Sequence, residues 1–127
     1  MKNLFIVLAI LLALACSIMP LSALAARKGL QTPDKGWAEP AVYFAARVRM
    51  RCFRYRPAVA ILDRAIKTWP ESSKVPNACF WIGFCYERSD ANAEAVQWYT
   101  MFLQKYPRHD WAPQARRRID AIEAQNL

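Results

Sequence analysis

Apolar side chains recur at helical spacing along most of this chain, in short segments separated by polar residues and proline. Between Pro70 and Pro107 two such stripes follow one another, and they comprise Ala78, Ile82, Gly83 and Tyr86, then Ala95, Trp98, Tyr99, Phe102 and Leu103. Positions spaced i, i+3, i+4 and i+7 lie on one side of an α-helix and form a face that can be buried. The pattern predicts two helices joined by a polar turn, with Ser89 or Asp90 as the N-cap of the second.

The preceding interval, between Pro33 and Pro70, has the same plan. Its two stripes comprise Val42, Ala45 and Ala46, then Ala58, Ile61, Leu62, Ala65, Ile66 and Trp69. Pro57 stands just before the second stripe, and the first turn of a helix accepts proline because its N–H has no intrahelical partner there. This interval therefore predicts a second helical hairpin.

The two hairpins are related by a fixed separation of 37 residues. The stretches "PDKGWAEPA" at 33–41, "PESSKVPNA" at 70–78 and "PRHDWAPQA" at 107–115 each open with proline and close with alanine. Pairs such as Ala58/Ala95 and Trp69/Tyr106 keep the same separation within the units. A constant period of this length is typical of stacked helical repeats.

The second unit resembles the tetratricopeptide repeat signature, which is a small residue, an aromatic, an alanine, an aromatic and a closing proline. The matching residues are Gly83, Tyr86, Ala95, Tyr99 and Pro107. The first unit is degenerate, because Arg49 and Leu62 replace the two aromatics. The inter-repeat segments "TWPESSKVPNA" and "KYPRHDWAPQA" are similar to those of bacterial envelope repeat proteins of the outer-membrane assembly lipoprotein (BamD-like) and Tol-Pal coordinator type.

This resemblance covers about residues 33–123 and implies an all-α fold. We expect a short right-handed superhelix of antiparallel helical hairpins, with about two and a half repeats. The expected repeats cover about 39–72 and 76–109 within a domain at 38–127. A helix at 110–125 would close the array, because its remaining faces carry Arg116, Arg117, Arg118, Asp120 and Glu123. Two and a half repeats are near the minimum for a stable array, which makes self-association a further expectation.

The first 25 residues are typical of a secretory signal peptide. An apolar run follows Lys2, and Ala23 and Ala25 suit signal peptidase, so we expect a mature N-terminus at Ala26 and an N-terminal linker at 26–37. The protein would then be exported and periplasmic. Two alternatives remain: an uncut membrane anchor, and lipidation at Cys16, although Ala13 stands where a lipobox normally has leucine.

Charge and cysteine content indicate which partners, disulfides and metal sites to expect. The chain has 18 basic and 10 acidic residues, a net charge of +8, which draws it towards anionic surfaces. Cleavage would leave Cys52, Cys79 and Cys85. We expect buried free thiols, with a Cys52–Cys85 disulfide as the alternative. No CxxC pair or close Cys/His spacing is present, so we expect no metal site and no cofactor.

The repeat resemblance implies a concave groove lined by the first helix of each unit. The groove positions that carry over are Tyr43, Arg47, Arg51, Asn77, Phe80, Phe84 and Arg88. Guanidinium groups pair bidentately with carboxylates while rings cover apolar side chains, so this set favours an acidic peptide segment as partner. The alternatives are a plain solvated surface and a surface that contacts anionic lipid or polymer. Nucleic acid is disfavoured by export.

Enzymatic activity is not expected. His109 is the only histidine, lies in the turn after Pro107 and is expected to act within that turn. The three glycines are too dispersed to form a phosphate-binding loop. The sequence therefore favours a non-catalytic protein-interaction scaffold of the bacterial cell envelope. The alternative is a basic peripheral protein that binds envelope lipid or polymer.

Overall fold

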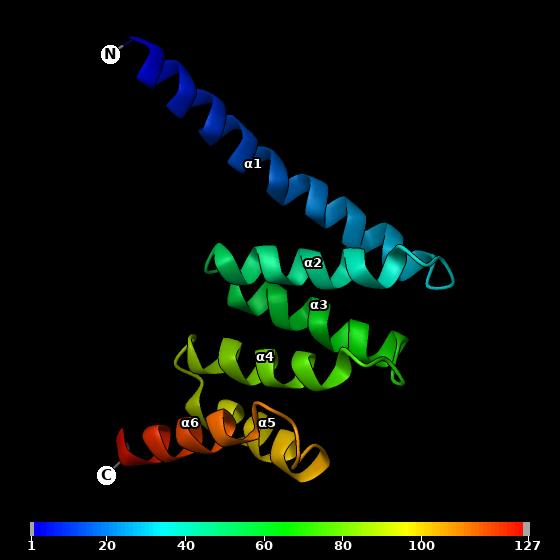
Figure 1. Ribbon diagram of the computed structural model, residues 1–127, viewed down its shortest axis with the longest axis vertical. Helices are drawn as coiled ribbons and strands as arrows, with labels where there is room; N and C mark the ends of the chain where they lie inside the picture. The colour runs from blue at the N-terminus through cyan, green and yellow to red at the C-terminus, as the bar shows by residue number, and fades with distance from the viewer. Residues whose placement is uncertain (1, 126–127) are drawn as a thin grey trace.

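The fold of residues 2–125 is all-α. The computed structural model describes this range, in which six helices and no β-strand are present (Figure 1). The helices are α1 (Lys2–Gln31), α2 (Ala38–Arg51), α3 (Tyr55–Thr68), α4 (Val75–Glu87), α5 (Asn92–Lys105) and α6 (Ala112–Gln125). The all-helical class expected from the sequence is confirmed.

The helix boundaries repeat at the separation found in the sequence. α2, α4 and α6 begin at Ala38, Val75 and Ala112, each 37 residues after the last, and α3 and α5 begin at Tyr55 and Asn92. A proline stands in the first turn of four of these helices, at positions 40, 57, 76 and 113. Proline is pre-organised for a first turn and loses no hydrogen bond there, so it fixes where each helix starts.

The loops before α2, α4 and α6 also share one backbone hydrogen bond. The first residue of each helix donates its N–H to the carbonyl three residues earlier, at Lys35, Ser72 and His109, with N···O distances of 2.8, 3.1 and 2.9 Å. The three residues differ in type, although Ser72 Oγ and His109 Nδ1 each accept the backbone N–H two residues later, both at 3.1 Å. The proline-containing segments therefore repeat as one backbone conformation, which is why they tolerate different sequences.

The turns within the two hairpins are a second repeated feature. Phe53 and Asp90, also 37 residues apart, both have positive φ, of 58° and 59°. The residue after each donates its N–H to a carbonyl five residues back: Arg54 to Arg49 at 2.8 Å and Ala91 to Tyr86 at 3.0 Å. The expected Ser89 or Asp90 cap was wrong, because Ala91 occupies the N-cap position of α5 and no side chain caps it.

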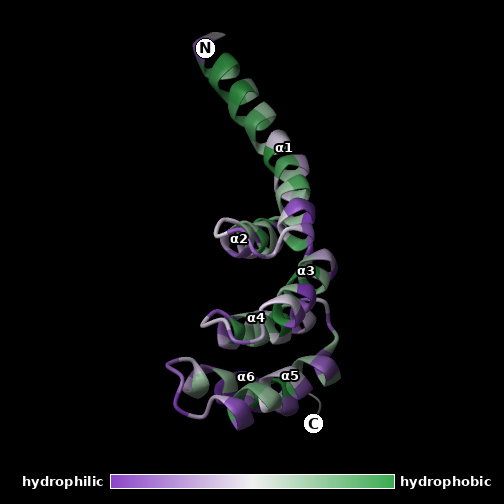
Figure 2. Ribbon diagram, turned by 90° about the vertical axis from the view of Figure 1, so that its right-hand side faces the viewer, coloured by the Kyte–Doolittle hydropathy of each residue, from purple (hydrophilic) through white to green (hydrophobic). Residues whose placement is uncertain are grey.

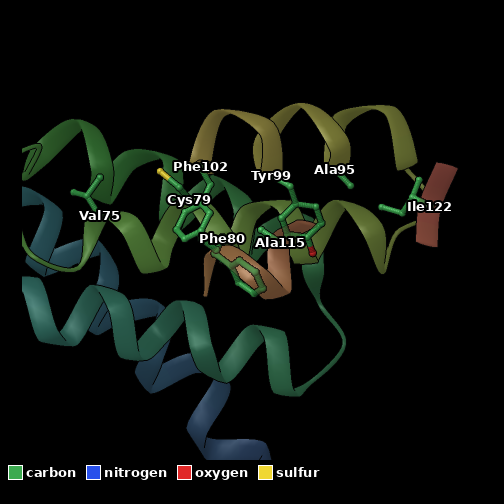
Figure 3. Close-up of a cluster of buried hydrophobic side chains, with 9 residues drawn as sticks. Val75, Cys79, Phe80, Ala95, Tyr99, Phe102, Ala115 and Ile122 are labelled. Carbon is green, nitrogen blue, oxygen red and sulfur yellow. The ribbon is translucent and has the colours of Figure 1, made fainter. Parts of the chain in front are cut away.

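The helices pack in chain order, each against the next. Figure 2 shows α2, α4 and α6 on one side and α1, α3 and α5 on the other, so that the chain alternates between two layers. Two linked clusters fill the space between the layers. One cluster contains Val42, Leu62 and Ile82, and the other contains Phe80, Tyr99 and Phe102 (Figure 3).

Small residues let the layers approach closely. Gly83 of α4 faces the ring of Tyr99 of α5, and a Cβ at this glycine would lie 2.9 Å from two ring atoms. Ala46, Ala58 and Ala95 are fully buried. The alternation of small and large residues across facing helices fills the core at close-packed density.

The end of α1 belongs to the array. α1, α3 and α5 end at Gln31, Thr68 and Lys105, again 37 residues apart, so the last turns of α1 stand in register with the second helix of a hairpin. Its Ser22, Ala26 and Gly29 are buried against α2. The structure differs here from the expected linker at 26–37, since 26–31 are helical and packed, and only 32–37 form a loop.

The rest of α1 carries exposed apolar side chains. Those from Leu4 to Leu21 are 45 to 70% exposed, and the segment Asn3–Gln31 is long and apolar enough to cross a membrane. Such a helix is compatible with a signal sequence and with a membrane anchor. The coarse prediction of an apolar N-terminal targeting segment therefore agrees with the structure.

Candidate functional site: the face shared by α2, α4 and α6

The structure separates the seven expected groove residues into two groups. Arg47, Arg51 and Arg88 are exposed, and Asn77 and Phe84 are half-buried. Tyr43 and Phe80 are 4 and 5% exposed, and their rings pack between helices. These two therefore offer little surface to a partner.

A neighbouring residue takes the place of Phe80 on this face. Trp81 of α4 is half-buried, the Arg47 guanidinium lies 5.9 Å from its ring centroid, and the ring of Trp111 lies 6.2 Å away. A cation over a tryptophan face is a favourable contact even at exposed sites. Arg47, Trp81 and Trp111 thus form a continuous line across α2, α4 and the start of α6.

The repeat register explains why Trp81 was missed. Tyr43 and Phe80 are 37 residues apart and both point into the core, whereas the positions one residue later are Phe44, Trp81 and Arg118. One residue rotates a helix position by about 100°. Because α4 is apolar on nearly every side, its stripes did not distinguish these two positions. The 58% exposure of Phe44 shows that the later position faces outwards in α2.

A second group of contacts lies at the other end of the face. Phe84 has the Arg118 guanidinium 5.1 Å from its ring centroid, and its ring meets that of Tyr55 edge-on at 6.3 Å. The neighbouring Tyr55 hydroxyl raises the pKa of the exposed Arg88 guanidinium. Arg51 and Arg88 lie outside the three ion pairs formed within residues 2–125, as does Arg47.

The Glu87 carboxylate accepts hydrogen bonds from two side chains beneath this face. Both of its carboxylate oxygens accept from Nη1 of Arg118 at 2.9 Å, and one accepts from the Tyr99 hydroxyl at 2.7 Å. Burial, followed by the bond to Glu87, raises the pKa of Tyr99. This network ties α4, α5 and α6 together. It also means that Glu87 does not neutralise the exposed arginines of α2.

His109 makes one hydrogen bond within its turn, where the sequence placed its role, and a second one to α4. Its Nε2 lies 3.1 Å from Oδ1 of Asn77, and its Nδ1 accepts the Trp111 backbone N–H at 3.1 Å. Since Nδ1 accepts, Nε2 carries the proton and donates to Asn77. The imidazole therefore positions Trp111 beside Trp81 and fixes the orientation of the Asn77 amide.

The cysteines are free thiols in the described residues. Cys52 is exposed at the end of α2, whereas Cys79 and Cys85 are buried. Burial raises the pKa of the Cys79 thiol, and raises that of Cys85 to about 12. The alternative Cys52–Cys85 disulfide is not formed. No group of three or more His, Cys, Asp or Glu side chains could hold a metal ion within residues 2–125.

A wide pocket of about 660 Å³ lies elsewhere, between α1, α2 and α3. Apolar residues and the three arginines Arg27, Arg49 and Arg64 line it. Arg49 is the residue that replaces the signature aromatic of the first unit. Its guanidinium donates to Ser22 Oγ at 3.3 Å and to its own helix, and burial lowers its pKa.

No model of a known protein family matches this chain, and no curated protein is significantly similar to it.

Proposed function

We propose that the protein is an exported, non-catalytic binding module of the bacterial cell envelope, similar to tetratricopeptide repeat proteins. In this proposal the α2–α4–α6 face holds an extended partner segment that carries acidic residues. The observation that carries it is the line of Arg47, Trp81 and Trp111. One cationic group and two aromatic rings follow one another along it, and Arg47 forms no ion pair within residues 2–125.

The chemistry of the face supports an acidic peptide. Arg47 and Arg51 lie one helical turn apart on α2, and both are exposed. A carboxylate that binds between them gains charge-assisted hydrogen bonds and relieves their mutual repulsion. Trp81, Phe84 and Trp111 supply apolar surface for neighbouring side chains. Arginine and tryptophan are enriched among residues that dominate binding energy at protein interfaces.

The test uses a peptide selected from a random library displayed on phage, then synthesised and titrated by fluorescence anisotropy. We expect the selected peptides to be rich in Asp and Glu. Replacing Arg47 and Arg51 together by Glu should weaken binding by about 3 kcal/mol, the scale for lost charge-assisted bonds at an interface. Trp81→Ala should also weaken it, and part of the affinity should persist at moderate salt because the aromatic contacts are not screened.

The matched control is Arg116→Glu with Arg117→Glu. These two exposed arginines of α6 change the net charge by the same amount, and Arg117 stands in register with Tyr43 and Phe80 rather than with Trp81. They therefore lie off the proposed face. Equal weakening by both double variants would show that only net charge matters, and the peptide-binding proposal would then be abandoned.

A further inference from the structure

The turn between α2 and α3 presents an aromatic ring to solvent. Phe53 is 74% exposed, the highest value among the large apolar residues within residues 3–125. Its nearest aromatic neighbour is Tyr55, with ring centroids 6.4 Å apart. Phe53 therefore makes little use of its apolar surface within the protein.

The backbone at this turn gives no reason for a phenylalanine. Phe53 has a φ of 58°, a left-handed conformation that Gly, Asn and Asp adopt readily and bulky residues rarely adopt. The equivalent turn after α4 has the same conformation and hydrogen bond, and it uses Asp90. Since the turn itself favours a small polar residue, the ring of Phe53 has its use outside the fold.

Basic residues flank Phe53 on both sides in the sequence. Five arginines, at positions 47, 49, 51, 54 and 56, and no acidic residue lie between Glu39 and Asp63. Arg51, Arg54 and Arg56 are exposed, and they are absent from the ion pairs within residues 2–125. An exposed ring flanked by unpaired guanidinium groups is complementary to an interface that is apolar inside and anionic at its surface.

The turn also lies where the apolar part of α1 leaves the domain. Arg49, one turn before Phe53, contacts Ser22, the first buried residue of α1. Figure 1 shows α1 projecting away from the domain on the side where α2 ends. Residues 3–21 of α1 would span about 28 Å at the helical rise, close to the thickness of a bilayer core. The headgroup region would then lie at the level of Ser22 and this turn.

We propose that the α2–α3 turn docks the domain on an anionic bilayer, with the Phe53 ring inserted among the headgroups and Arg51 and Arg54 bound to lipid phosphates. The proposal shares Arg51 with the peptide-binding face, but Phe53 and Arg54 lie outside that face. It does not depend on retention of α1, because a cleaved domain keeps Phe53 and all five arginines. Tryptophan and tyrosine are the usual aromatic residues at such interfaces, and here Tyr55 follows Phe53 closely.

The native thiol of Cys52, next to Phe53 and exposed, reports on this docking. The full chain with Cys16→Ser is reconstituted in nanodiscs of phosphatidylcholine alone, or of phosphatidylcholine mixed with phosphatidylglycerol. The rate of Cys52 modification by a charged, membrane-impermeant maleimide is measured in both. The ratio of the two rates cancels any direct effect of a substitution on thiol reactivity. We expect modification to be about tenfold slower in the anionic discs, because attraction of Arg51 and Arg54 to the anionic surface favours the docked state there.

Three variants decide the outcome, each checked for helical content by circular dichroism. Phe53→Ser and the pair Arg51→Glu with Arg54→Glu should each lose most of the protection, whereas Arg116→Glu with Arg117→Glu should keep it. Equal rates in both discs for the unaltered turn would overturn the proposal. Full protection in Phe53→Ser would also overturn it, because arginines alone would then hold any polyanion without ring insertion. Equal loss of Cys52 protection in both double-arginine variants would show that only net charge matters, and this result would also overturn the proposal.

Discussion

Gly83 illustrates how one residue sets a helix contact. Its missing side chain lets α4 approach the Tyr99 ring, and the sequence already indicated a small residue at this position of the repeat. A methyl group here would lie 2.9 Å from the ring. We expect Gly83→Ala to lower the free energy of unfolding by about 1 to 3 kcal/mol, as overpacked core positions do. Urea denaturation measures this value.

Gly36 provides the comparison for this prediction. It lies in the loop before α2, has no positive φ, and a Cβ there would meet no atom within 4 Å. Gly36→Ala should therefore be neutral or slightly stabilising, because it reduces the entropy of the unfolded chain. If both alanine variants unfolded at the same urea concentration, the close contact with Tyr99 would not be a source of stability.

The buried Cys85 thiol makes stability depend on alkaline pH. Burial raises its pKa from 9.0 to about 12 in the folded state. Between these values the unfolded chain loses the proton and the folded chain keeps it, so stability is fully present below pH 9 and falls as pH rises towards 12. We expect Cys85→Ala to flatten the fall of the unfolding free energy over this range, measured by urea denaturation at several pH values.

Cys52 is the matched control, because it is exposed. Cys52→Ala should leave the alkaline pH dependence unchanged. In the native protein, Cys52 should also react with a thiol reagent well before Cys79 and Cys85. An equally steep loss of stability in Cys85→Ala would assign the effect to other buried groups with a raised pKa, such as Tyr43, Tyr99 and Cys79.

Among the elements, the two hairpin turns show what sequence patterns reveal and what they miss. The stripes of apolar residues predicted where the helices lie, and the 37-residue separation predicted that they form repeated units. Both patterns arise because each helix is buried against a neighbouring helix. The left-handed residues at 53 and 90 were not foreseen, since neither is glycine. Nor could the stripes of α4 decide between Phe80 and Trp81 as the outward residue, because both sides of that helix are apolar.

The conformation of Phe53 leads to a prediction about stability. The left-handed conformation costs most residues with a Cβ about 1 to 2 kcal/mol of conformational free energy. The cost is smaller for asparagine, because its side chain can hydrogen-bond locally. We therefore expect Phe53→Asn to raise the free energy of unfolding by about 1 kcal/mol. Asp90→Asn, at the equivalent position, should change it by less than about 0.5 kcal/mol. A Phe53→Asn chain no more stable than the original would mean that the turn carries no strain at this residue.

At the scale of the whole molecule, the N-terminal helix has two parts with different roles. The exposed apolar part suits export. Ala23 and Ala25 predict a mature N-terminus at Ala26. Mass spectrometry of the protein isolated from its own cell would measure this N-terminus. An acylated Cys16 or an intact Met1 would contradict cleavage. The packed part, from Ala26 to Gln31, was assigned to a linker because it is too short to show a helical stripe of its own.

Packing of residues 26–31 on α2 would survive cleavage, and Gly29 tests whether it does. A Cβ at Gly29 would lie 2.8 Å from Val42 Cγ2 and 2.9 Å from the Ala38 carbonyl oxygen. The backbone oxygen cannot move aside easily, so Gly29→Ala should destabilise both the full chain and the processed protein by about 1 to 3 kcal/mol. Lys28→Ala, an exposed change in the same turn, should cost less than about 0.5 kcal/mol. If Gly29→Ala destabilised only the full chain, the segment would be a free linker after processing, and the array would begin at α2.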